Sequence, residues 1–418
     1  MKIGFFTDSY FPRLDGVAIS VETSAQALRA RGHEVYIIAP RHPRYKDIDP
    51  NVYRLASIRF PTVPGTPEAR LALPLPEKPL LQVLKIDFDI IHGHSTLSGI
   101  TFLGFQIAKS RNIPYVTTYH TLWNRYTHYI FNGKIITPKM VEIASRFMVN
   151  FCDCLIAPTE RVKKELVSYG VKRSIEVFPS GIDVKYFKKN KKGFLRKKTN
   201  IEKDKKILLY CGRLGKEKSL DFVIESFKLI HKQNPQTALV LIGEGPDLKK
   251  LKLLTKKLKL QNDVYFLGLI DYKNMPLVYA DADLFLFASQ TETQGLVVLE
   301  ALASGVPAIA VEDAALKNVI DSGKNGYFVK KDQKQFAEKV LKLIGDQSMH
   351  DSFSKAAQKT ADKFSTDKTA KRLESLYFKL INKKSSEQQK MNINYSGVMN
   401  FFAKTNEQIK KYYALIDQ

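Results

Sequence analysis

Residues 285–310 read FLFASQTETQGLVVLEALASGVPAIA, and this stretch decides the fold of the chain. An apolar run of strand length at 284–287 enters a polar loop, and a second apolar run covers 306–311. Between the two runs a helix is predicted to begin near Gly295. Buried strands that alternate with helices are typical of a parallel sheet covered on both faces.

The start of this helix has the chemistry of a phosphate-binding site. The N–H groups of Gly295, Leu296 and Val297 have no partner within the helix and lie at the positive end of its dipole. Glu292 precedes the helix, and Glu300 lies about 7.5 Å further along its axis. A diphosphate at the helix start would leave one carboxylate on either side for hydroxyl groups, which describes a nucleotide sugar. Two glutamates at this spacing also occur by chance in many α/β proteins.

The composition is that of a soluble globular protein with room for two domains. The chain has 418 residues, of which 44% are hydrophobic and 26% are charged. No apolar run approaches the length of a membrane span. Asp8 and Pro12 interrupt the apolar stretch near the N-terminus, so we expect no signal peptide and a cytoplasmic location. Cys152, Cys154 and Cys211 are expected to be small apolar filler and not a zinc site.

The net charge of +24 is the strongest compositional signal. It favours nucleic acid, anionic lipid or anionic nucleotides as partners. Much of the excess lies in two basic segments, 185–206 and 249–259, which are solvated faces by default. Such clusters also attract an anionic lipid surface by about 1 kcal/mol per basic residue. We therefore expect any membrane role to be peripheral, on the inner face of the cell membrane.

Apolar runs and helical patterns alternate along most of the chain. In the first part, strands are predicted at 2–7, 34–40, 88–92, 114–119, 153–158 and 174–178, and helices at 17–30, 97–110, 137–151 and 159–169. In the second part, a strand opens the segment KILLYCGRL at 206–214, and others follow at 237–243, 263–268, 283–288 and 306–311. The predicted fold class is α/β, with two Rossmann-like doubly wound domains at 1–185 and 207–364, a basic linker at 186–206 and an extension at 383–418.

Ligands of such sheets bind beyond the carboxyl ends of the strands. Three histidines are predicted at those ends: His92, His94 and His120. His92 and His94 are as readily structural as functional, and a His-x-His pair alone predicts no metal site. Gly16, after the first strand, would let the backbone approach a phosphate closely. Because the Gly-x-Gly-x-x-Gly spacing is missing there, we do not predict NAD binding.

The pattern from Glu292 to Pro307 is Glu-x-x-Gly-Leu-x-x-x-Glu-Ala-x-Ala-x-Gly-x-Pro. In this pattern the chain resembles the retaining glycosyltransferases of family 4, and the resemblance extends from residue 1 to about 382. It implies the GT-B fold, in which two Rossmann-like domains face a central cleft. It also implies that a last helix, 365–382, crosses back onto the first domain.

The resemblance implies a donor site and a set of catalytic residues. Arg213 and Lys218, in GRLGKEK, match the cations that bind the donor diphosphate in the family. Glu300 would bind the ribose hydroxyls, Glu292 those of the transferred sugar, and His120 would face that sugar. The implied donor-binding set is Gly16, Arg213, Lys218, Gly245, Leu269, Glu292, Gly295, Leu296, Val297 and Glu300, and the implied catalytic set is His120, Arg213, Lys218 and Glu292.

The cations and the helix start are expected to replace a divalent metal, so no metal and no cofactor are predicted. Asp281-Ala-Asp283 has a metal-binding spacing but directly precedes a buried strand, and we interpret it as the polar lead-in to that strand. The family carries a glycine-rich loop after the first strand, whereas this chain has Asp15-Gly16, so Gly16 alone would take that role. Retention would use attack from the face of departure, with a diphosphate oxygen taking the acceptor proton. Inversion would need a general base, for which His120 has the chemistry.

The segment YHTLWNRYTHYI, 119–130, is dense in aromatic residues. It is either a packed loop or an acceptor site at a membrane interface, formed by Trp123, Tyr126 and Tyr129. This segment and RLALPLPEKP, 70–79, look like those of the diacylglycerol glucosyltransferases within the family. We therefore predict transfer of glucose from UDP-glucose to 1,2-diacylglycerol in an anionic membrane surface.

Other interpretations stay open at this point. The acceptor of a family 4 enzyme is alternatively another lipid, a polysaccharide or a soluble molecule. A nucleic-acid-binding protein would use the basic segments, but phosphate would be repelled by Glu292 and Glu300, so we expect no nucleic acid partner. The extension at 383–418 is too aromatic for a plain disordered tail, and it would dock on the protein, on a twin subunit or on lipid. The oligomeric state is not predicted.

Overall fold

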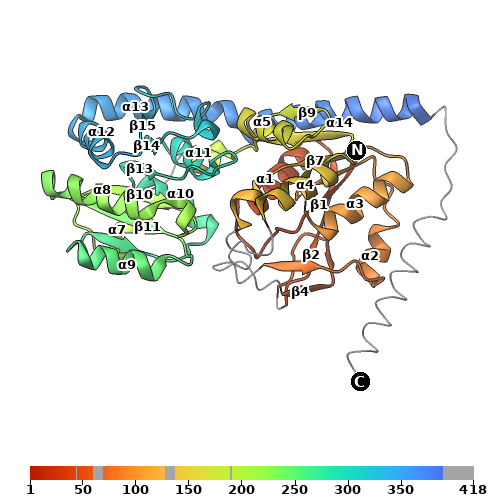
Figure 1. The fold of residues 1–418 in the computed structure, drawn as a ribbon, viewed down its shortest axis with the longest axis horizontal. Coiled ribbons are helices and arrows are strands. Elements are labelled where there is room, and N and C mark those ends of the chain that lie inside the picture. Colours follow the sequence, from red (N-terminus) through yellow and green to blue (C-terminus); the bar gives the residue numbers. More distant parts are fainter. Residues whose placement is uncertain (44, 60–68, 96, 128–136, 189–190, 389–418) are drawn as a thin grey trace, which may run out of the picture. The chain divides into compact units, whose positions relative to one another are not determined.

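The structure is a computed structural model. It describes the chain except residues 44, 60–68, 96, 128–136, 189–190 and 389–418. The described residues form two compact units, the first made of Met1–Pro179 and 369–388, the second of Ser180–Lys368. Each unit is a parallel sheet covered by helices (Figure 1). This confirms the α/β fold class with two Rossmann-like sheets.

The first unit is built on a seven-stranded parallel sheet in the order β3-β2-β1-β6-β7-β8-β9. Its strands are β1 Lys2–Phe6, β2 Glu34–Pro40, β3 Val52–Leu55, β6 Ile90–Gly93, β7 Tyr115–Thr118, β8 Cys154–Ala157 and β9 Ile175–Val177. β4 Ser57–Arg59 and β5 Arg70–Ala72 form a separate antiparallel pair. The six predicted strands all exist, whereas β3, β4 and β5 were missed because they have only three or four residues each.

Helices cover both faces of this sheet. They are α1 Gly16–Arg29, α2 Lys78–Val83, α3 Gly99–Ser110, α4 Pro138–Val149, α5 Glu160–Ser168 and α14 Thr366–Gln388, with a 3-10 turn η1 at Trp123–Arg125. Side-chain caps set four of the starts, because the oxygens of Asp15, Ser98, Thr137 and Thr159 accept hydrogen bonds from the first free N–H groups of α1, α3, α4 and α5.

Alternate residues of each strand enter two separate cores. Phe6, Ile38 and Ile91 pack beneath α2, α3, α4 and α5. Their neighbours Phe5, Ile37 and Ile90 pack beneath α1 and α14. The helix α14 supplies Leu373, Leu376, Tyr377 and Leu380 to the second of these cores. The crossing of the last helix onto the first unit is therefore confirmed, over a longer helix than 365–382.

The second unit has a six-stranded parallel sheet in the order β12-β11-β10-β13-β14-β15. Its strands are β10 Lys206–Cys211, β11 Thr237–Ile242, β12 Val264–Phe266, β13 Leu284–Phe287, β14 Ala308–Val311 and β15 Gly326–Val329. Its helices are α6 Val184–Lys188, α7 Phe194–Thr199, α8 Leu220–Gln233, α9 Leu248–Lys257, α10 Met275–Ala280, α11 Leu296–Ala303, α12 Gln333–Gly345 and α13 Gln347–Ala361, with 3-10 turns η4 Lys216–Lys218, η5 Tyr272–Asn274, η6 Ala314–Leu316 and η7 Asp362–Phe364. β15 was not predicted, and the five other strands were.

The predicted basic linker, 186–206, is folded into the second unit and is not a linker. Phe187, Leu195 and Ile201 are buried in its core. The carboxylate of Asp281 accepts hydrogen bonds from the N–H groups of Gly193 and Leu195 at the start of α7. Charge alone suggested a solvated segment, but its widely spaced apolar residues and the capping by Asp281 hold it against α10 and α11.

The neighbouring Asp283 is also structural. Its carboxylate accepts a hydrogen bond of 2.7 Å from the N–H of Ile207 and lies 3.3 Å from Lys206 Nζ. The interpretation of Asp281-Ala-Asp283 as a lead-in to β13 is therefore confirmed for Asp283, while Asp281 has the additional role of capping α7. The three cysteines are buried and free, as the composition predicted. Within the described residues, no helix combines the length and the apolar character needed to cross a membrane.

Candidate functional site

The strand order of the second unit reverses between β10 and β13, which lie side by side at the centre of the sheet. Loops that leave the carboxyl ends of two such strands diverge and form a binding crevice. Arg213 and Lys218 follow β10, and Glu292 and Gly295 follow β13. The four predicted residues therefore leave the sheet at its topological switch point.

Three strand-end loops of this sheet are bonded to one another through their backbones. The N–H of Gly212 donates to Ile242 at 2.9 Å, and the N–H of Gly243 donates to Gly268 at 2.8 Å. Gly245 lies so close to the backbone of Leu214 that a Cβ atom at position 245 would be 2.3 Å from the Leu214 carbonyl oxygen. The predicted donor residue Gly245 thus has a packing role at this edge. Leu269, which follows Gly268, is 67% exposed.

The helix α11 begins at the predicted place and without a side-chain cap. Gly295 is its N-cap residue, with φ of 75°, and a Cβ atom on it would lie 2.5 Å from Leu316 Cδ2. The first bond inside the helix runs from the N–H of Val298 to the carbonyl of Gly295 at 3.0 Å. The N–H groups of Gly295, Leu296 and Val297 therefore lie at the positive end of the helix dipole, as predicted.

The loop before α11 is fixed by the side chain of Gln294. This amide accepts a hydrogen bond from the N–H of Ser180 and donates one to its carbonyl, both at 2.8 Å. Gln294 is 4% exposed. A buried amide with bonds to both backbone groups of one residue holds the loop in a single position, so the direction in which the start of α11 points is fixed.

Lys218 and Glu292 are brought together from positions 74 residues apart. The Nζ atom of Lys218 lies 2.5 Å from Oε1 of Glu292, and both side chains are 14% exposed. The sequence predicted a cation for phosphate and a carboxylate for sugar hydroxyls, but not that they form an ion pair. In such a pair each group fixes the position of the other and offsets the loss of its hydration.

Arg213 also lies beside a carboxylate. Its guanidinium is 2.7 Å from Glu217, whose side chain is 2% exposed. Sequence analysis did not single out Glu217, although its spacing of four residues from Arg213 in GRLGKEK is a signal for such a pair. The hydroxyl of Tyr210 donates to the carbonyl of Arg213 at 3.0 Å and so fixes its backbone.

Glu300 is a buried carboxylate, 3% exposed. The hydroxyl of Tyr279 donates to it at 2.7 Å and that of Tyr272 at 3.2 Å. Burial raises the pKa of Glu300 to about 7, and the two tyrosine hydroxyls act in the opposite direction. Sequence analysis missed both tyrosines. Their spacing of seven residues across η5 and α10 places them on one side of this segment, a signal that only becomes meaningful beside a known carboxylate.

In the first unit, three histidines cluster at the ends of β6 and β7. His92 is bonded to Tyr377 at 2.6 Å and to Thr118 at 2.7 Å, so its role is structural and ties the sheet to α14. Nδ1 of His94 lies 3.2 Å from Nε2 of His120, and their rings are stacked. Burial lowers the pKa of His92 to about 3 and that of His120 to about 4, and it lowers that of His94 well below its ordinary value. All three rings are therefore neutral at pH 7.

Two further carboxylates lie beyond the end of β1. Sequence analysis did not select Asp8 for a site, yet burial raises its pKa to about 6, against hydrogen bonds from Ser95 and Ser98. Asp15 accepts from the N–H groups of Val17 and Ala18, each at 3.0 Å, at the start of α1. Gly16 is the first residue of α1, so the predicted phosphate contact lies at a helix end that a carboxylate already caps.

The aromatic residues predicted for the acceptor are partly described. Trp123 and Tyr126 are half-buried, and η1, which contains Trp123, packs against α4. Tyr129 lies outside the described residues. In the portion of the chain that the structure describes, no group of three or more His, Cys, Asp or Glu side chains is arranged to hold a metal ion.

Two Rossmann-like sheets, a helix start at the switch point of the second sheet, and a terminal helix that returns to the first unit define a GT-B glycosyltransferase. Residues 14–186 match the family described as Glycosyltransferase Family 4, and residues 191–360 match Glycosyl transferases group 1. The chain belongs to glycosyltransferase family 4, which confirms the resemblance in its sequence.

Similar proteins span nearly the whole chain. It is 35% identical to alpha-monoglucosyldiacylglycerol synthase of Streptococcus pneumoniae, over 87% of this chain and 83% of that protein. It is 30% identical to alpha-monoglucosyldiacylglycerol synthase of Acholeplasma laidlawii, over 93% of this chain and 100% of that protein. Among solved structures, HepE of Anabaena in complex with UDP matches with a TM-score of 0.71 and 18% identity, over 91% of this chain and 100% of that one, which is a likeness of fold.

Proposed function

We propose that the chain transfers glucose from UDP-glucose to 1,2-diacylglycerol with retention of the anomeric configuration. The observation that carries this proposal is the similarity to two alpha-monoglucosyldiacylglycerol synthases over more than four-fifths of each chain. Both proteins are named for an alpha-linked monoglucosyl product on diacylglycerol. A shared acceptor is the simplest reason for similarity that extends through the first unit as well as the second.

The donor is proposed to bind at the switch point of the second sheet. Its diphosphate would lie at the start of α11, where Gly295, Leu296 and Val297 present N–H groups. Glu300 would accept hydrogen bonds from the ribose hydroxyls, in place of one or both tyrosine hydroxyls that it now receives. UDP as the nucleotide is supported by a structural neighbour of the same fold, HepE, whose solved complexes contain UDP and UDP-glucose.

Transfer breaks the bond between the anomeric carbon and the diphosphate oxygen, and negative charge develops on that oxygen. Lys218 and Arg213 would stabilise this charge, together with the helix dipole. In the structure both cations are held beside carboxylates, Glu292 and Glu217, so they are positioned before the donor arrives. Glu292 would then accept hydrogen bonds from hydroxyls of the transferred sugar. Its ion pair with Lys218 would fix its position relative to that cation.

The acceptor hydroxyl forms the new bond to the anomeric carbon on the face from which the diphosphate leaves. Its proton passes to the departing diphosphate oxygen, so atoms and charge balance without a base from the protein. His120, neutral at pH 7 because burial lowers its pKa to about 4, would donate or accept a hydrogen bond at the sugar without carrying a charge. Placement of the enzyme as a peripheral protein on an anionic membrane surface is part of the same proposal.

A panel of nucleotide sugars, incubated with diacylglycerol vesicles and read by mass spectrometry of the lipids, tests the proposal. The expected result is monoglucosyldiacylglycerol from UDP-glucose, with an alpha anomeric proton in the NMR spectrum. A beta product would contradict retention. Transfer to a polysaccharide or a soluble acceptor, with none to diacylglycerol, would replace the proposed acceptor and leave the family assignment unchanged.

A further inference from the structure

One face of α4 exposes large apolar side chains. Met140 is 53% exposed, Ile143 is 49% exposed and Phe147 is 61% exposed, at positions i, i+3 and i+7 of a single helix. These three residues are called the α4 stripe below. At helical spacing they span about 60° of the circumference. On the opposite side of α4, Val141, Ser145 and Val149 are buried, so the stripe is not part of the core of the unit.

Positive side chains flank the α4 stripe. Lys139 and Arg146, both exposed, lie along one side of it, and Lys139 pairs with Glu142 at 3.2 Å. The exposed Lys172 and Arg173 join this flank beyond the end of α4. The N–H of Lys172 donates to the side-chain oxygen of Asn150 at 3.2 Å, and Nε of Arg173 donates to its carbonyl at 2.6 Å.

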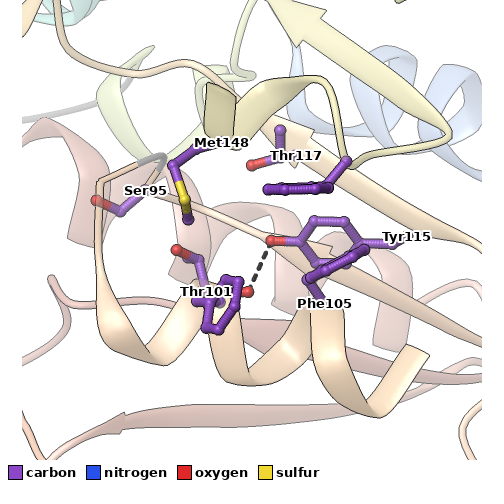
Figure 2. A pocket seen from close by; sticks show the side chains of 8 residues that line it. Ser95, Thr101, Phe105, Tyr115, Thr117 and Met148 are labelled. Carbon is purple, nitrogen blue, oxygen red and sulfur yellow. Dashed lines mark hydrogen bonds between the residues drawn. The ribbon is translucent and has the colours of Figure 1, made fainter. Parts of the chain in front are cut away.

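On its other side, the α4 stripe continues into an apolar pocket. The ring of Phe147 packs edge-on against Phe151 at 4.8 Å, and Phe151 stacks on Phe105 at 4.9 Å. The pocket is narrow, with room for about one water molecule, and is lined by Ser95, Thr101, Phe102, Phe105, Tyr115, Thr117, Met148 and Phe151. Figure 2 shows Met148 and Phe105 at this pocket and the Tyr115 hydroxyl, which donates to the carbonyl of Thr101 at 2.9 Å.

We propose that the α4 stripe inserts into an anionic lipid bilayer. This inference rests on the proposed function, because it assumes a lipid acceptor. An amphipathic helix with an apolar face and a basic flank lies in the interface of such bilayers. The ring of Phe151, which packs against Phe147, adds to the apolar side chains on this side of the helix.

A second copy of the chain is a poorer fit for the same face. Three side chains are few for a stable interface, which needs about 800 Å² on each partner. In a symmetric pair the same patch meets itself, so the flanks with Arg146, Lys172 and Arg173 would approach each other. Positive charges brought close together repel each other and oppose association, whereas the phosphate groups of an anionic bilayer attract these side chains.

The double variant Ile143→Ser, Phe147→Ser tests the surface by flotation with phosphatidylcholine vesicles that contain phosphatidylglycerol. Both side chains are exposed, so the fold and the melting temperature should be retained. We expect the vesicle partition coefficient to fall by about tenfold or more, because apolar insertion is lost. Leu253→Ser is the matched control, since Leu253 is 70% exposed on the lysine-rich helix α9 of the other unit. It should leave the coefficient unchanged.

Three outcomes overturn the proposal. The first is wild-type vesicle binding by the double variant, and the second is an equal loss of binding with Leu253→Ser. The third is a dimer in solution that the double variant dissociates. A wild-type chain that binds vesicles through the α4 stripe but glucosylates no diacylglycerol would instead contradict the proposed function and leave the surface intact.

Discussion

At the scale of single residues, Glu300 is buried and is also proposed to bind the ribose hydroxyls of the donor. A carboxylate that binds two ribose hydroxyls must be ionised, yet burial raises the pKa of Glu300 to about 7. The hydroxyls of Tyr272 and Tyr279 already donate hydrogen bonds to it. The tyrosines therefore keep the ionised form accessible in a buried position.

The variant Glu300→Gln should change how stability depends on pH. From pH 4.5 to about 7 the folded wild type binds a proton that the unfolded chain has released, so its free energy of unfolding falls as the pH rises through this window. The variant has no carboxyl group at this position, so its free energy of unfolding does not fall in this way. Relative to the wild type it should gain up to roughly 3 kcal/mol between pH 4 and pH 8, measured by denaturant unfolding. The control Asp271→Asn, at a side chain that is 72% exposed, should gain nothing comparable.

The variant Lys218→Ala should lose catalysis and not only binding. It removes a cation beside the departing diphosphate and leaves Glu292 without this partner. Loss of one preorganised stabilising group lowers kcat by about 10²- to 10³-fold. Steady-state kinetics with UDP-glucose measure the effect. Lys273→Ala, at a cation that is 76% exposed in the same unit, serves as control and should keep wild-type kcat. Full activity of Lys218→Ala would contradict the site.

At the scale of elements, the start of α11 depends on a glycine that tertiary packing requires. Gly295 has a φ of 75°, a region that other residues enter at an energetic cost, and its Cβ position is filled by Leu316. A side chain there would displace the start of the helix or Leu316 itself. The N–H groups that are proposed to bind the diphosphate would move with it.

Gly295→Ala should therefore weaken donor binding, whereas Gly323→Ala should not. Gly323 has a similar φ, 87°, but no atom lies within 4 Å of its Cβ position. Both variants are expected to lose about 1 kcal/mol of stability to the left-handed backbone, and only Gly295→Ala has the additional clash. Calorimetric titration with UDP-glucose measures the difference. Equal affinities in the two variants would argue against the helix start as the diphosphate site.

The strand ends of β6 and β7 make the first unit sensitive to acid. His92, His94 and His120 are neutral when folded because burial lowers the pKa of each ring. Unfolded histidines gain a proton near pH 6.5, so the stability present above that pH is lost as the pH falls from 6.5 towards 4. In His120→Asn, the number of protons taken up on unfolding in this pH range should be smaller by up to one. The pH dependence of the free energy of unfolding measures this number. An unchanged slope would contradict the neutral state of His120.

At the scale of the whole molecule, the net charge of +24 favours an anionic surface as the working environment. Binding of one nucleotide sugar, which glycosyltransferases of this family use as donor, would bring one diphosphate to the protein. The negative charge of one diphosphate is small beside this net positive charge. The basic helix α9 and the flank of the α4 stripe lie in different units, so the excess of positive charge is not confined to one unit.

The transfer rate on vesicles should consequently fall with salt. Raising the ionic strength from about 0.05 M to about 0.5 M shortens the screening length to a few ångströms and should lower the rate on vesicles that contain phosphatidylglycerol by about tenfold or more. Transfer to a dispersed short-chain diacylglycerol is the control and should change little. A rate on vesicles that is independent of salt would show that charge does not bring the enzyme to its acceptor.

Much of the fold followed from local pattern. Eleven predicted strands exist, since each is an apolar run of sufficient length between turn residues. The short strands β3 and β15 were missed because neither is a continuous buried apolar run: β3 contains Arg54, and β15 begins with Gly326. The segment 186–206 was misread for a different reason: charged residues dominate its composition, while Phe187, Leu195 and Ile201 hold it in the core.

The residues of the candidate site divide in the same way, into those that a local pattern reveals and those that it does not. Gly295, Glu292, Glu300, Arg213 and Lys218 were found because their spacing along the chain is itself the signal. The tyrosines around Glu300 and the buried Asp8 were not found, because each matters only through a neighbour in space. Glu217 was also not found, although its spacing of four residues from Arg213 is a local signal. The roles of all these residues in transfer remain predictions, with the experiments above as their tests.

The sequence by itself determined the order of strands and helices, the glycine at the start of α11 and the membership of the family, because hydrophobic period and residue spacing are properties of neighbours along the chain. Only the tertiary structure decided that Lys218 meets Glu292, that His92 is held by Tyr377 of α14, and that α4 exposes its apolar stripe. These contacts join residues tens to hundreds of positions apart or depend on which side of a helix is covered. Such pairings are fixed by the packing of whole elements and carry no local signature.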